Sequence, residues 1–488
     1  MGLKTVEQYQ ESLRDGRVVY ISGQKIEDVT KSDMLRMGIE TSSIDYAMAE
    51  MPEYRDLSVV MDEEIGEPIS RYYYTPRNGD DLLKRHDLMV TGTRLGLGHV
   101  PFSKDIASDA LNAVKVTAKA MGKLEYIERA EAFRRHLCKN DLSMAGAVTC
   151  VKGDRSLRPS DPGQEHPDFY VRVVERNSDG IIVRGAKAHI TGAAYYNEIL
   201  VIPCRNMGEA DKDYAVSFAV PPNTKGVIQV PHPMHYRQGA DEFPVELPFR
   251  GHTDCLIIFD DVFVPWDRVF MCGEWEYAMT LVYNFAYLHR HTAASYHIPP
   301  YEAMVGMAQA MAEYNGIEKV GHVREKITDM IIYVNTLKSL ARASCMDYVE
   351  HEGIPIPNPV ITNIAKYHYA NNYHTCAKAL VDICGGLLST APTYRDWTNP
   401  EIGALLQKYL VGKAGTSAED RLRMLQLIRN TLGVENDVRT LHAEGSLAAQ
   451  RMTIYAESVK DLHEYKKQAK KYAGIEQPEQ NDFVLFDH

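Results

Sequence analysis

Apolar residues recur at two different spacings along the chain, and the change of spacing divides it into three parts. Residues 1–140 show helical spacing, with an apolar residue every three to four positions, apart from a short hairpin at 17–26. Between 141 and 275 the apolar runs are short and bounded by Gly or Pro, which is typical of strands. Residues 276–488 return to helical spacing until a polar tail begins at about 474. The pattern predicts a helical N-terminal domain, a middle β domain and a C-terminal helical bundle.

Four segments carry the clearest helical pattern. We expect helices over 80–91, with a start signal at Asn78, and over 108–129. Two long amphipathic helices are expected in the bundle, over 323–350 and 418–432. The β part should form a medium-sized sheet or barrel.

Composition narrows the class of protein. The 488 residues are 45% apolar and 25% charged, which is ordinary for a globular chain long enough for about three domains. A net charge of -12 argues against nucleic acid as a partner, because binding phosphate needs a concentrated basic face. The eight cysteines are scattered without a CxxC pair, and no run of 18 apolar residues or N-terminal signal core occurs. We therefore expect reduced thiols, no membrane span and a cytoplasmic location.

Two polar, Gly-punctuated loops in the β part are candidates for binding a flat cofactor. The chain has no GxGxxG or GxxxxGK[ST] motif at a strand-to-helix turn, which disfavours Rossmann and P-loop sites. Hydroxyl and imidazole groups in the loops suit the edge of an isoalloxazine ring, and two cations suit an anionic or electron-rich part of it. These residues are Thr149, Ser156, His189 and Thr191, with the cations Lys152 and Arg155. The alternative is that the polar side chains simply complete turns.

Two further candidates lie in the helical bundle. His289 and Tyr296 are seven residues apart and share one helical face, so together they can move a proton near neutral pH. The alternative is a helix packed through hydrogen-bonded aromatic side chains. Gly385 and Gly386 allow a backbone or a pyrophosphate to approach closely, and they are equally consistent with a helix end.

Several collinear motifs resemble those of the 4-hydroxyphenylacetate 3-hydroxylase family, which also contains 4-hydroxybutyryl-CoA dehydratase. The motifs are Lys-Gly-Asp-Arg at 152–155, Gly-Ala-Lys-Ala-His-Ile-Thr-Gly at 185–192, Asp-Lys-Asp-Tyr-Ala-Val-Ser-Phe-Ala at 211–219, Phe-Asp-Asp-Val-Phe-Val-Pro at 259–265 and Asp-Ile-Cys-Gly-Gly at 382–386. By these loops the chain is more similar to the dehydratase branch. The order of helix, sheet and bundle is similar to the α+β architecture of acyl-CoA dehydrogenase-like flavoproteins.

The resemblance implies that the chain binds FAD and forms a homotetramer. It assigns FAD to two segments of the β part and places Gly385 and Gly386 against the flavin of a neighbouring subunit. The residues implied in the first two segments are Val148, Thr149, Lys152, Gly153, Asp154, Arg155, His189, Ile190 and Thr191.

The departures from the family concern the cluster and the substrate. The dehydratase branch holds a [4Fe-4S] cluster with three Cys and one His, and its Cys positions are Pro101, Asp105 and Tyr296 here, with only His289 matched. Thiolates are what such a cluster needs, so no cluster and no metal are expected. The acidic residue of that branch is Asp254 rather than Glu.

The hydroxylase branch is not matched in full either. Its substrate His falls on Gly146, and its Arg and Tyr pair has no convincing counterpart around 103–107. A remodelled substrate pocket is expected instead, with a single metal held by N and O ligands as a minor alternative. Its candidate residues are His99, Asp105, His289, His291 and Tyr296.

Three functions are consistent with this reading. The leading one is a two-component monooxygenase that hydroxylates an aromatic or phenolic small molecule with oxygen and with FAD reduced by a separate reductase, with His289 or Tyr296 assisting proton removal. The second is a cluster-free acyl-CoA dehydratase, isomerase or dehydrogenase that uses Asp254 or His289 as the base. The third is a flavin-binding protein without catalysis.

Overall fold

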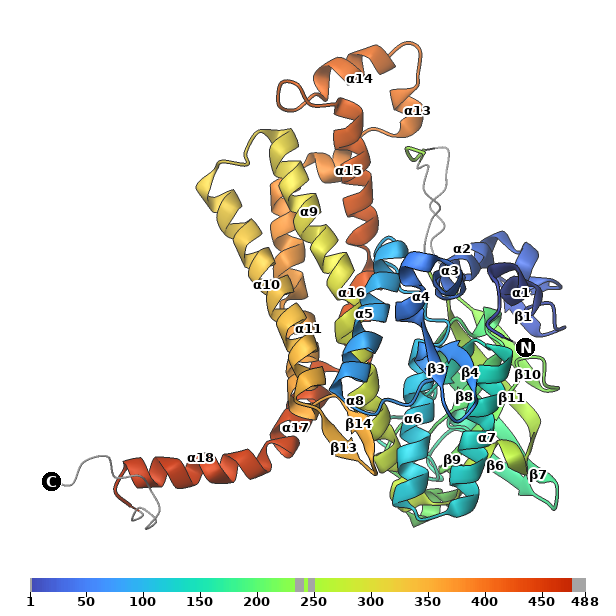
Figure 1. Cartoon of the computed structure of the whole chain (residues 1–488). Coiled ribbons are helices and arrows are strands. Elements are labelled where there is room, and N and C mark those ends of the chain that lie inside the picture. The colour runs from blue at the N-terminus through green and yellow to red at the C-terminus, as the bar shows by residue number, and fades with distance from the viewer. Residues whose placement is uncertain (1, 233–240, 245–250, 476–488) are drawn as a thin grey trace.

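The computed structural model describes residues 2–232, 241–244 and 251–475, and most of its first 140 residues are helical (Figure 1). The predicted polar tail after residue 475 lies outside the described part. Asn78 caps its helix as predicted, since its side chain accepts a hydrogen bond of 3.0 Å from the backbone N–H of Asp81. The single helix predicted over 108–129 is wrong, because Gly122 with φ +65° separates two helices. The helices of this part are α1 (Val6–Glu11), α2 (Asp33–Ser42), α3 (Ile44–Glu50), α4 (Pro52–Ser58), α5 (Gly79–Leu95), α6 (Asp105–Ala120) and α7 (Leu124–Asn140).

The strands of the middle part form two larger sheets. The six-stranded sheet has the order β2-β1-β10-β11-β7-β6, and the four-stranded sheet has the order β12-β9-β8-β5. Their bounds are β1 (Val18–Ile21), β2 (Gln24–Ile26), β6 (Arg172–Arg176), β7 (Gly180–Thr191), β10 (Val227–Pro231), β11 (Asp254–Pro265), β5 (Met144–Ala147), β8 (Glu198–Val201), β9 (Val216–Val220) and β12 (Val269–Cys272). Within the described residues neither sheet closes on itself, so the predicted sheet is found and the predicted barrel is not.

The two longest strands, β7 and β11, are neighbours in the six-stranded sheet, and neither lies at its edge. They pair antiparallel from Asp254 opposite Thr191 to Pro265 opposite Gly180. Alternate residues of β11, such as Ile257 and Phe259, are buried, and the ring of Phe259 meets that of Phe218 from the other sheet edge-on at 5.6 Å. The core of the β part therefore lies between the two sheets.

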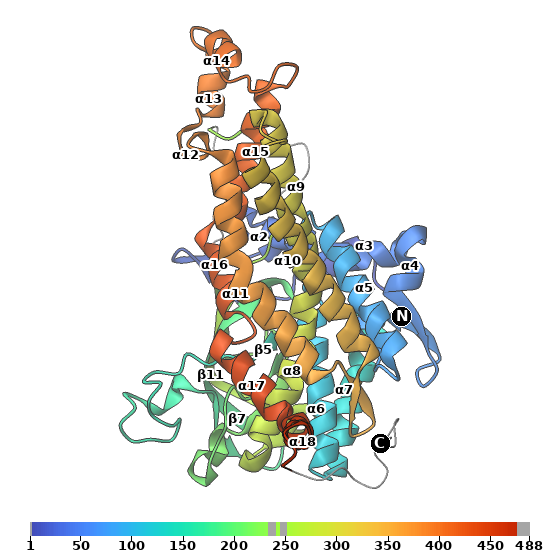
Figure 2. The same cartoon turned by 90° about the vertical axis from the view of Figure 1, so that its left-hand side faces the viewer.

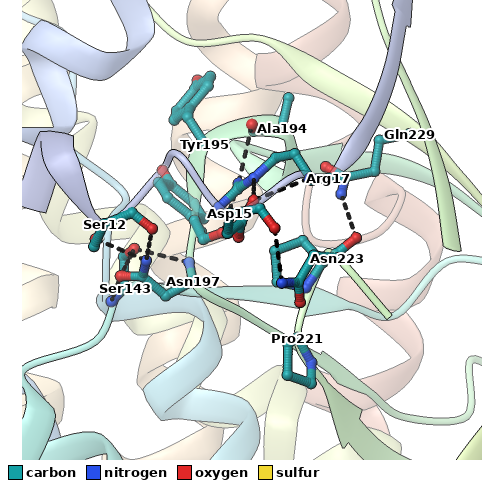
Figure 3. A network of polar contacts seen from close by, with 12 residues as sticks. Ser12, Asp15, Arg17, Ser143, Ala194, Tyr195, Asn197, Pro221, Asn223 and Gln229 are labelled. Atoms are coloured by element: carbon teal, nitrogen blue, oxygen red, sulfur yellow. Dashed lines mark hydrogen bonds and ion pairs between the residues drawn. The ribbon is translucent and has the colours of Figure 1, made fainter. Parts of the chain in front are cut away.

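The N-terminal hairpin is part of this core rather than of the helical layer. Strand β1 pairs in parallel with β10, with Val18 opposite Ile228. Figure 3 shows the polar contacts that fasten the preceding loop, where the buried Arg17 guanidinium donates to the backbone oxygen of Ala194 at 3.1 Å. In the same network the amide of Asn197 donates to the Ser12 hydroxyl at 2.9 Å. These contacts hold the first strands against the flank of the β part.

The C-terminal part is a bundle of long helices that stands beside the sheets (Figure 2). The helix predicted over 323–350 ends at Met346, and the hairpin of β13 (Val349–His351) and β14 (Ile354–Ile356), which was not predicted, follows it. The second predicted helix is found as α15. The helices are α8 (Ala278–Tyr296), α9 (Ile298–Asn315), α10 (Gly321–Met346), α11 (Pro359–Cys384), α12 (Leu387–Thr390), α13 (Tyr394–Trp397), α14 (Gly403–Tyr409), α15 (Ala418–Thr431), α16 (Val434–His442), α17 (Leu447–Glu457) and α18 (Val459–Tyr472).

One helix of the bundle bears directly on the site. Helix α8 packs against α6 of the N-terminal part and against α11 of the bundle, so it lies where the layers meet (Figure 2).

Helix α18 projects away from the body of the molecule (Figure 1). A small antiparallel hairpin of β3 (Val59–Asp62) and β4 (Glu67–Ser70) flanks α4. Among the described helices, none is long and apolar enough to cross a membrane.

Candidate active site

His289 lies on the face of α8 that meets α6, and it is held between two carboxylates. Its Nδ1 lies 3.3 Å from an oxygen of Asp109 on α6, and its Nε2 lies 3.8 Å from an oxygen of Glu444. The first distance is that of a hydrogen bond and the second is too long for one. Burial alone would lower the pKa of His289, but Asp109 and Glu444 outweigh it and raise that pKa above its ordinary value.

Asp109 is fixed from three sides. The Arg85 guanidinium donates to it at 2.7 Å, and the hydroxyl of Thr292, one turn after His289 on α8, donates to it at 2.7 Å. Burial opposes ionisation of Asp109, but Arg85 and His289 lower its pKa below the ordinary value. The carboxylate is therefore charged and rigid, and it orients the imidazole of His289.

Glu444 gathers the polar side chains of the bundle around one buried carboxylate. It lies in the turn between α16 and α17 and accepts hydrogen bonds from the hydroxyls of Tyr296 and, at 3.1 Å, Tyr369. Its other neighbour is the ammonium of Lys366 at 3.3 Å. The side chains of Lys366 and Glu444 are 0% and 3% exposed, so solvent does not screen the pair.

These contacts fix the charge states within the cluster. Burial would raise the pKa of Glu444, but Lys366 and His289 lower it to about 2. Burial, reinforced by Glu444, raises the pKa of Tyr296 well above its ordinary value. Tyr296 is therefore a neutral hydrogen-bond donor to a Glu444 carboxylate that is ionised at neutral pH.

Asp254 and Thr191 meet at the end of the β7–β11 ladder. The Thr191 hydroxyl donates to the Asp254 carboxylate at 2.7 Å, and the His252 ring lies 3.9 Å from the same oxygen. The Asp254 side chain stays 47% exposed, and although its partial burial acts in the opposite direction, His252 and Thr191 lower its pKa. The ring of Phe102 meets both His252 and Tyr296 edge-on, at 5.0 and 5.1 Å, so one aromatic side chain joins this pair to the His289 cluster.

The two segments assigned to FAD lie side by side. The backbone N–H of Ala188 donates to the oxygen of Thr149 at 2.8 Å, which places the loop that begins at Val148 beside His189, Ile190 and Thr191. Ile190 is buried, whereas His189 is exposed and has φ +61°. Such a backbone conformation is strained for a non-glycine residue and clusters at functional sites.

The loop itself has a tight turn that depends on glycine. Lys152 and Gly153 have φ +76° and +53°, and a Cβ on Gly153 would come within 2.2 Å of the Phe169 ring. Asp154 is used within the loop, since it accepts hydrogen bonds from the backbone and hydroxyl of Ser156. The side chains of Lys152 and Arg155 make no ion pair with any residue that the structure describes.

Gly385 and Gly386 form the end of α11 and the start of α12. Gly385 has φ +70°, and a Cβ on either residue would meet nothing within 4 Å. Figure 2 shows α12 at the far end of the bundle from β7. Within one chain the glycine pair is therefore not brought together with the FAD segments, and its role stays a prediction.

The candidate metal ligands are dispersed. The Nε2 of His291 faces the backbone oxygen of Ala341 at 3.2 Å, and His99 leaves Nδ1 buried without a partner among the described residues. Three or more His, Cys, Asp or Glu side chains do not group as ligands anywhere in the described ranges. Asp105 lies one turn before Asp109 on α6, and burial, together with the nearby charges of Asp45 and Asp109, raises its pKa to about 7.

Sequence reasoning missed Asp109, Glu444 and Lys366. Asp109 had a usable signal, because an acid flanked by Ala107, Ala110 and other apolar residues on a helix is buried and therefore paired. Glu444 had none, since its turn carries no periodic pattern and its partners come from helices distant in the sequence. Lys366 had no such signal either.

Comparison with known proteins identifies the family of the whole chain. The family model described as 4-hydroxyphenylacetate 3-hydroxylase N terminal matches residues 5–271, and the corresponding C-terminal model matches 278–474. The 4-hydroxybutyryl-CoA dehydratase/vinylacetyl-CoA-Delta-isomerase of Clostridium aminobutyricum is 33% identical, over 97% of this chain and all of that protein.

Hydroxylases of the same family are similar over a comparable range. The 4-hydroxyphenylacetate 3-monooxygenase oxygenase component of Thermus thermophilus is 30% identical, over 87% of each chain. A crystal structure of an oxygenase component of this monooxygenase complexed with FAD superimposes with a TM-score of 0.86 and 27% identity, over 97% of this chain and 99% of that one. The chain therefore belongs to the 4-hydroxyphenylacetate 3-hydroxylase family.

Proposed function

We propose that this protein is the oxygenase component of a two-component, FAD-dependent monooxygenase that hydroxylates an aromatic or phenolic small molecule. The observation that carries the proposal is the similarity, over nearly the whole chain, to an oxygenase component solved with FAD. The titratable cluster around His289 supports it, because removal of a phenol proton is the acid-base step such a substrate requires.

Unused polar groups near the proposed FAD segments support binding of a polar, flat ligand. The side-chain atoms Thr253 Oγ1 and His252 Nδ1 are buried without a partner among the described residues, and they directly precede Asp254. Because buried polar atoms are ordinarily hydrogen-bonded, such orphans fit a ligand that supplies the partners. The unpaired cations Lys152 and Arg155 suit its anionic groups.

In this proposal the FAD residues are the two adjoining segments described above, with Gly385 and Gly386 contributed to a neighbouring subunit. Reduced FAD, when bound, supplies the two electrons with which oxygen is activated for hydroxylation. Because the single hydroxyl proton of Thr191 is donated to Asp254, the Thr191 oxygen would accept a hydrogen bond from the ring, and Asp254 would fix its direction. This would make Asp254 a positioning residue with a lowered pKa rather than a strong base.

His289 would take the proton of the substrate hydroxyl. Asp109 holds the Nδ1 side of the ring, and Nε2, which lies 3.8 Å from the Glu444 carboxylate and makes no hydrogen bond with it, would accept the proton. The two carboxylates that raise the pKa of His289 also stabilise the imidazolium that this step creates. Tyr296, a neutral donor fixed by Glu444, would help to orient the ring of the substrate.

A second candidate is a cluster-free acyl-CoA dehydratase, isomerase or dehydrogenase. The similarity to the Clostridium aminobutyricum dehydratase over its full length favours it. The residues at the expected cluster positions oppose it, since Pro101, Asp105 and Tyr296 offer no thiolate. We therefore place this candidate second.

We further propose an acyl-CoA dehydrogenase-like arrangement of three domains, 1–140, 141–275 and 276–488, assembled as a homotetramer. Large apolar side chains exposed on α17 and α18, such as Met452, Tyr455 and Tyr465, support assembly. A separate reductase is proposed because the similar proteins are named oxygenase components. A cytoplasmic location is proposed because all eight cysteines are unpaired.

The test mixes the purified protein with anaerobically reduced FAD and then with oxygenated buffer containing 4-hydroxyphenylacetate or 4-nitrophenol. We expect a product one oxygen heavier, detected by mass spectrometry, and less hydrogen peroxide than in the absence of the phenol. A parallel anaerobic reaction with 4-hydroxybutyryl-CoA should leave the thioester unchanged. Loss of water from this thioester, with no oxygenated phenol, would refute the proposal in favour of the second candidate.

A further inference from the structure

Two cysteines and a buried lysine form a second chemical cluster, at the start of the first FAD segment. Strand β5 runs parallel to β8, and the printed register ends with Ala147 opposite Val201. The backbone N–H of Ile202 still donates to Ala147 at 3.2 Å beyond the last pair. Continuing this register by three residues places Cys150 opposite Cys204.

Lys187 shows that the two segments are still adjacent just before the cysteines. The residue is 1% exposed, and its ammonium donates to the backbone oxygens of Val148 at 2.6 Å and Ile202 at 2.8 Å. These two residues are opposite each other in the continued register. Lys187 also pairs with Cys150 as an isolated β-bridge. No carboxylate of the described residues neutralises it, so a thiolate is the anion that its position suits.

We propose that Cys150 and Cys204 form a reversible disulfide when the protein meets hydrogen peroxide. Neighbouring strands lie about 4.8 Å apart, which is within the range of about 4.4 to 6.8 Å between the Cα atoms of bridged cysteines. The pair therefore needs no large backbone movement to close.

The direction of the pKa shift at Cys150 distinguishes this pair from the other cysteines. Burial opposes ionisation of Cys150, but the Cys204 thiol and the Lys187 ammonium lower its pKa, and the same contact raises the pKa of Cys204. Burial raises the pKa of the remaining cysteines, which are Cys138, Cys255, Cys272, Cys345, Cys376 and Cys384.

Hydrogen peroxide is the two-electron oxidant for this disulfide. The Cys150 thiolate attacks one peroxide oxygen, the O–O bond breaks, and a sulfenic acid and hydroxide form. The sulfur of Cys204 then attacks the Cys150 sulfur, its proton leaves with the expelled hydroxide as water, and the S–S bond forms. Two thiols are oxidised and one peroxide is reduced to two waters. The inference does not depend on the proposed function, because the oxidant is added as a reagent.

The experiment treats the reduced full-length protein with hydrogen peroxide, alkylates the remaining thiols and digests with trypsin without reductant. Cleavage separates the two cysteines into peptides 140–152 and 188–205. We expect these peptides joined, two hydrogens lighter than their sum, and released by dithiothreitol. Recovery of both peptides alkylated, or of Cys150 oxidised further without the joined peptide, would overturn the proposal.

Variants sharpen the test. Cys150→Ser should abolish the joined peptide, and Cys204→Ser should leave a sulfenic acid on Cys150 that dimedone labels. Cys384→Ser, a buried cysteine at the end of α11, is the matched control and should not affect the joined peptide. Lys187→Met, in which trypsin releases 185–205 instead of 188–205, should slow oxidation by about tenfold or more by lowering the thiolate fraction. An unchanged yield in Cys150→Ser would also refute the pairing.

Discussion

Replacing Glu444 with glutamine should strongly destabilise the folded chain, because Lys366 would lose its counter-ion inside the bundle. The two side chains are 3.3 Å apart and almost fully buried. Besides Glu444, the ammonium donates to the backbone oxygen of Thr440 at 3.0 Å. A neutral glutamine would leave this charge with neutral partners such as the Thr440 carbonyl and the Tyr369 ring.

Two approaches give a similar magnitude for the loss. Breaking a buried ion pair by removing one partner costs about 3 to 5 kcal/mol. Independently, although burial acts against it, Lys366 and His289 hold the pKa of Glu444 at about 2 instead of 4.5. At about 1.4 kcal/mol per pKa unit, the difference corresponds to about 3 to 4 kcal/mol. Because the folded pKa is depressed, this contribution is complete above about pH 4.5 and is lost as the pH falls toward 2.

The assay is a double-mutant cycle of Glu444→Gln with Lys366→Met, followed by urea unfolding and far-ultraviolet circular dichroism at pH 7. Glu444→Gln alone should lose about 3 to 5 kcal/mol, and the double variant should regain much of it. The matched control is Glu302→Gln with Lys338→Met, an ion pair of 2.8 Å whose side chains are 30% and 41% exposed. Its coupling energy should be below about 1 kcal/mol. Equal coupling energies for the two pairs would refute the reasoning.

Three further predictions concern the site, and one concerns the fold. His289→Gln should keep FAD while lowering turnover about 10²- to 10⁴-fold, measured as product per bound FAD; full activity would remove His289 from the mechanism. Thr191→Val should weaken FAD binding about five- to a hundredfold in a fluorescence titration, by loss of a hydrogen bond worth about 1 to 3 kcal/mol; an unchanged dissociation constant would reject its assignment. Since a base must be neutral and, despite burial, Asp109 and Glu444 raise the pKa of His289, the acid limb of the kcat–pH profile should lie above about pH 6.5. Asp109→Asn should move this limb to lower pH, and an unmoved limb would contradict the pairing. Gly192→Ala should cost about 1 to 3 kcal/mol in thermal unfolding, because φ is +70° and its Cβ would lie 2.1 Å from the ring of Tyr196; wild-type stability would show that the turn can relax.

The parts of the fold that the sequence predicted are those with a local cause. Asn78 caps a helix because its side chain reaches the backbone three residues on, and this can be read directly from the sequence. The break at Gly122 was missed because the apolar spacing continues through it, although the backbone turns there with φ +65°. Sheet order depends on contacts between distant strands, so the open arrangement of the two sheets had no local signal.

The same distinction applies to the candidate site. His289 and Tyr296 could be paired from helical spacing alone, and both do contact Glu444. The pairing of Thr191 with Asp254 depends on the register of two strands more than 60 residues apart, which spacing does not reveal. Glu444 lies in a turn and is recognised only by the charges and hydroxyls that surround it.

The parallel pairing of β1 with β10 delays completion of this sheet during synthesis. Val18 has no partner on that edge until Ile228 has been made, about 210 residues later. At about 5 to 20 residues per second, the ribosome needs roughly 10 to 40 s to supply it. During this interval β1, which contains Val18 and Val19, has an unpaired edge of the kind that chaperones protect. A chain stalled before residue 228 should therefore bind a nascent-chain chaperone through its first 30 residues and release it once β10 emerges.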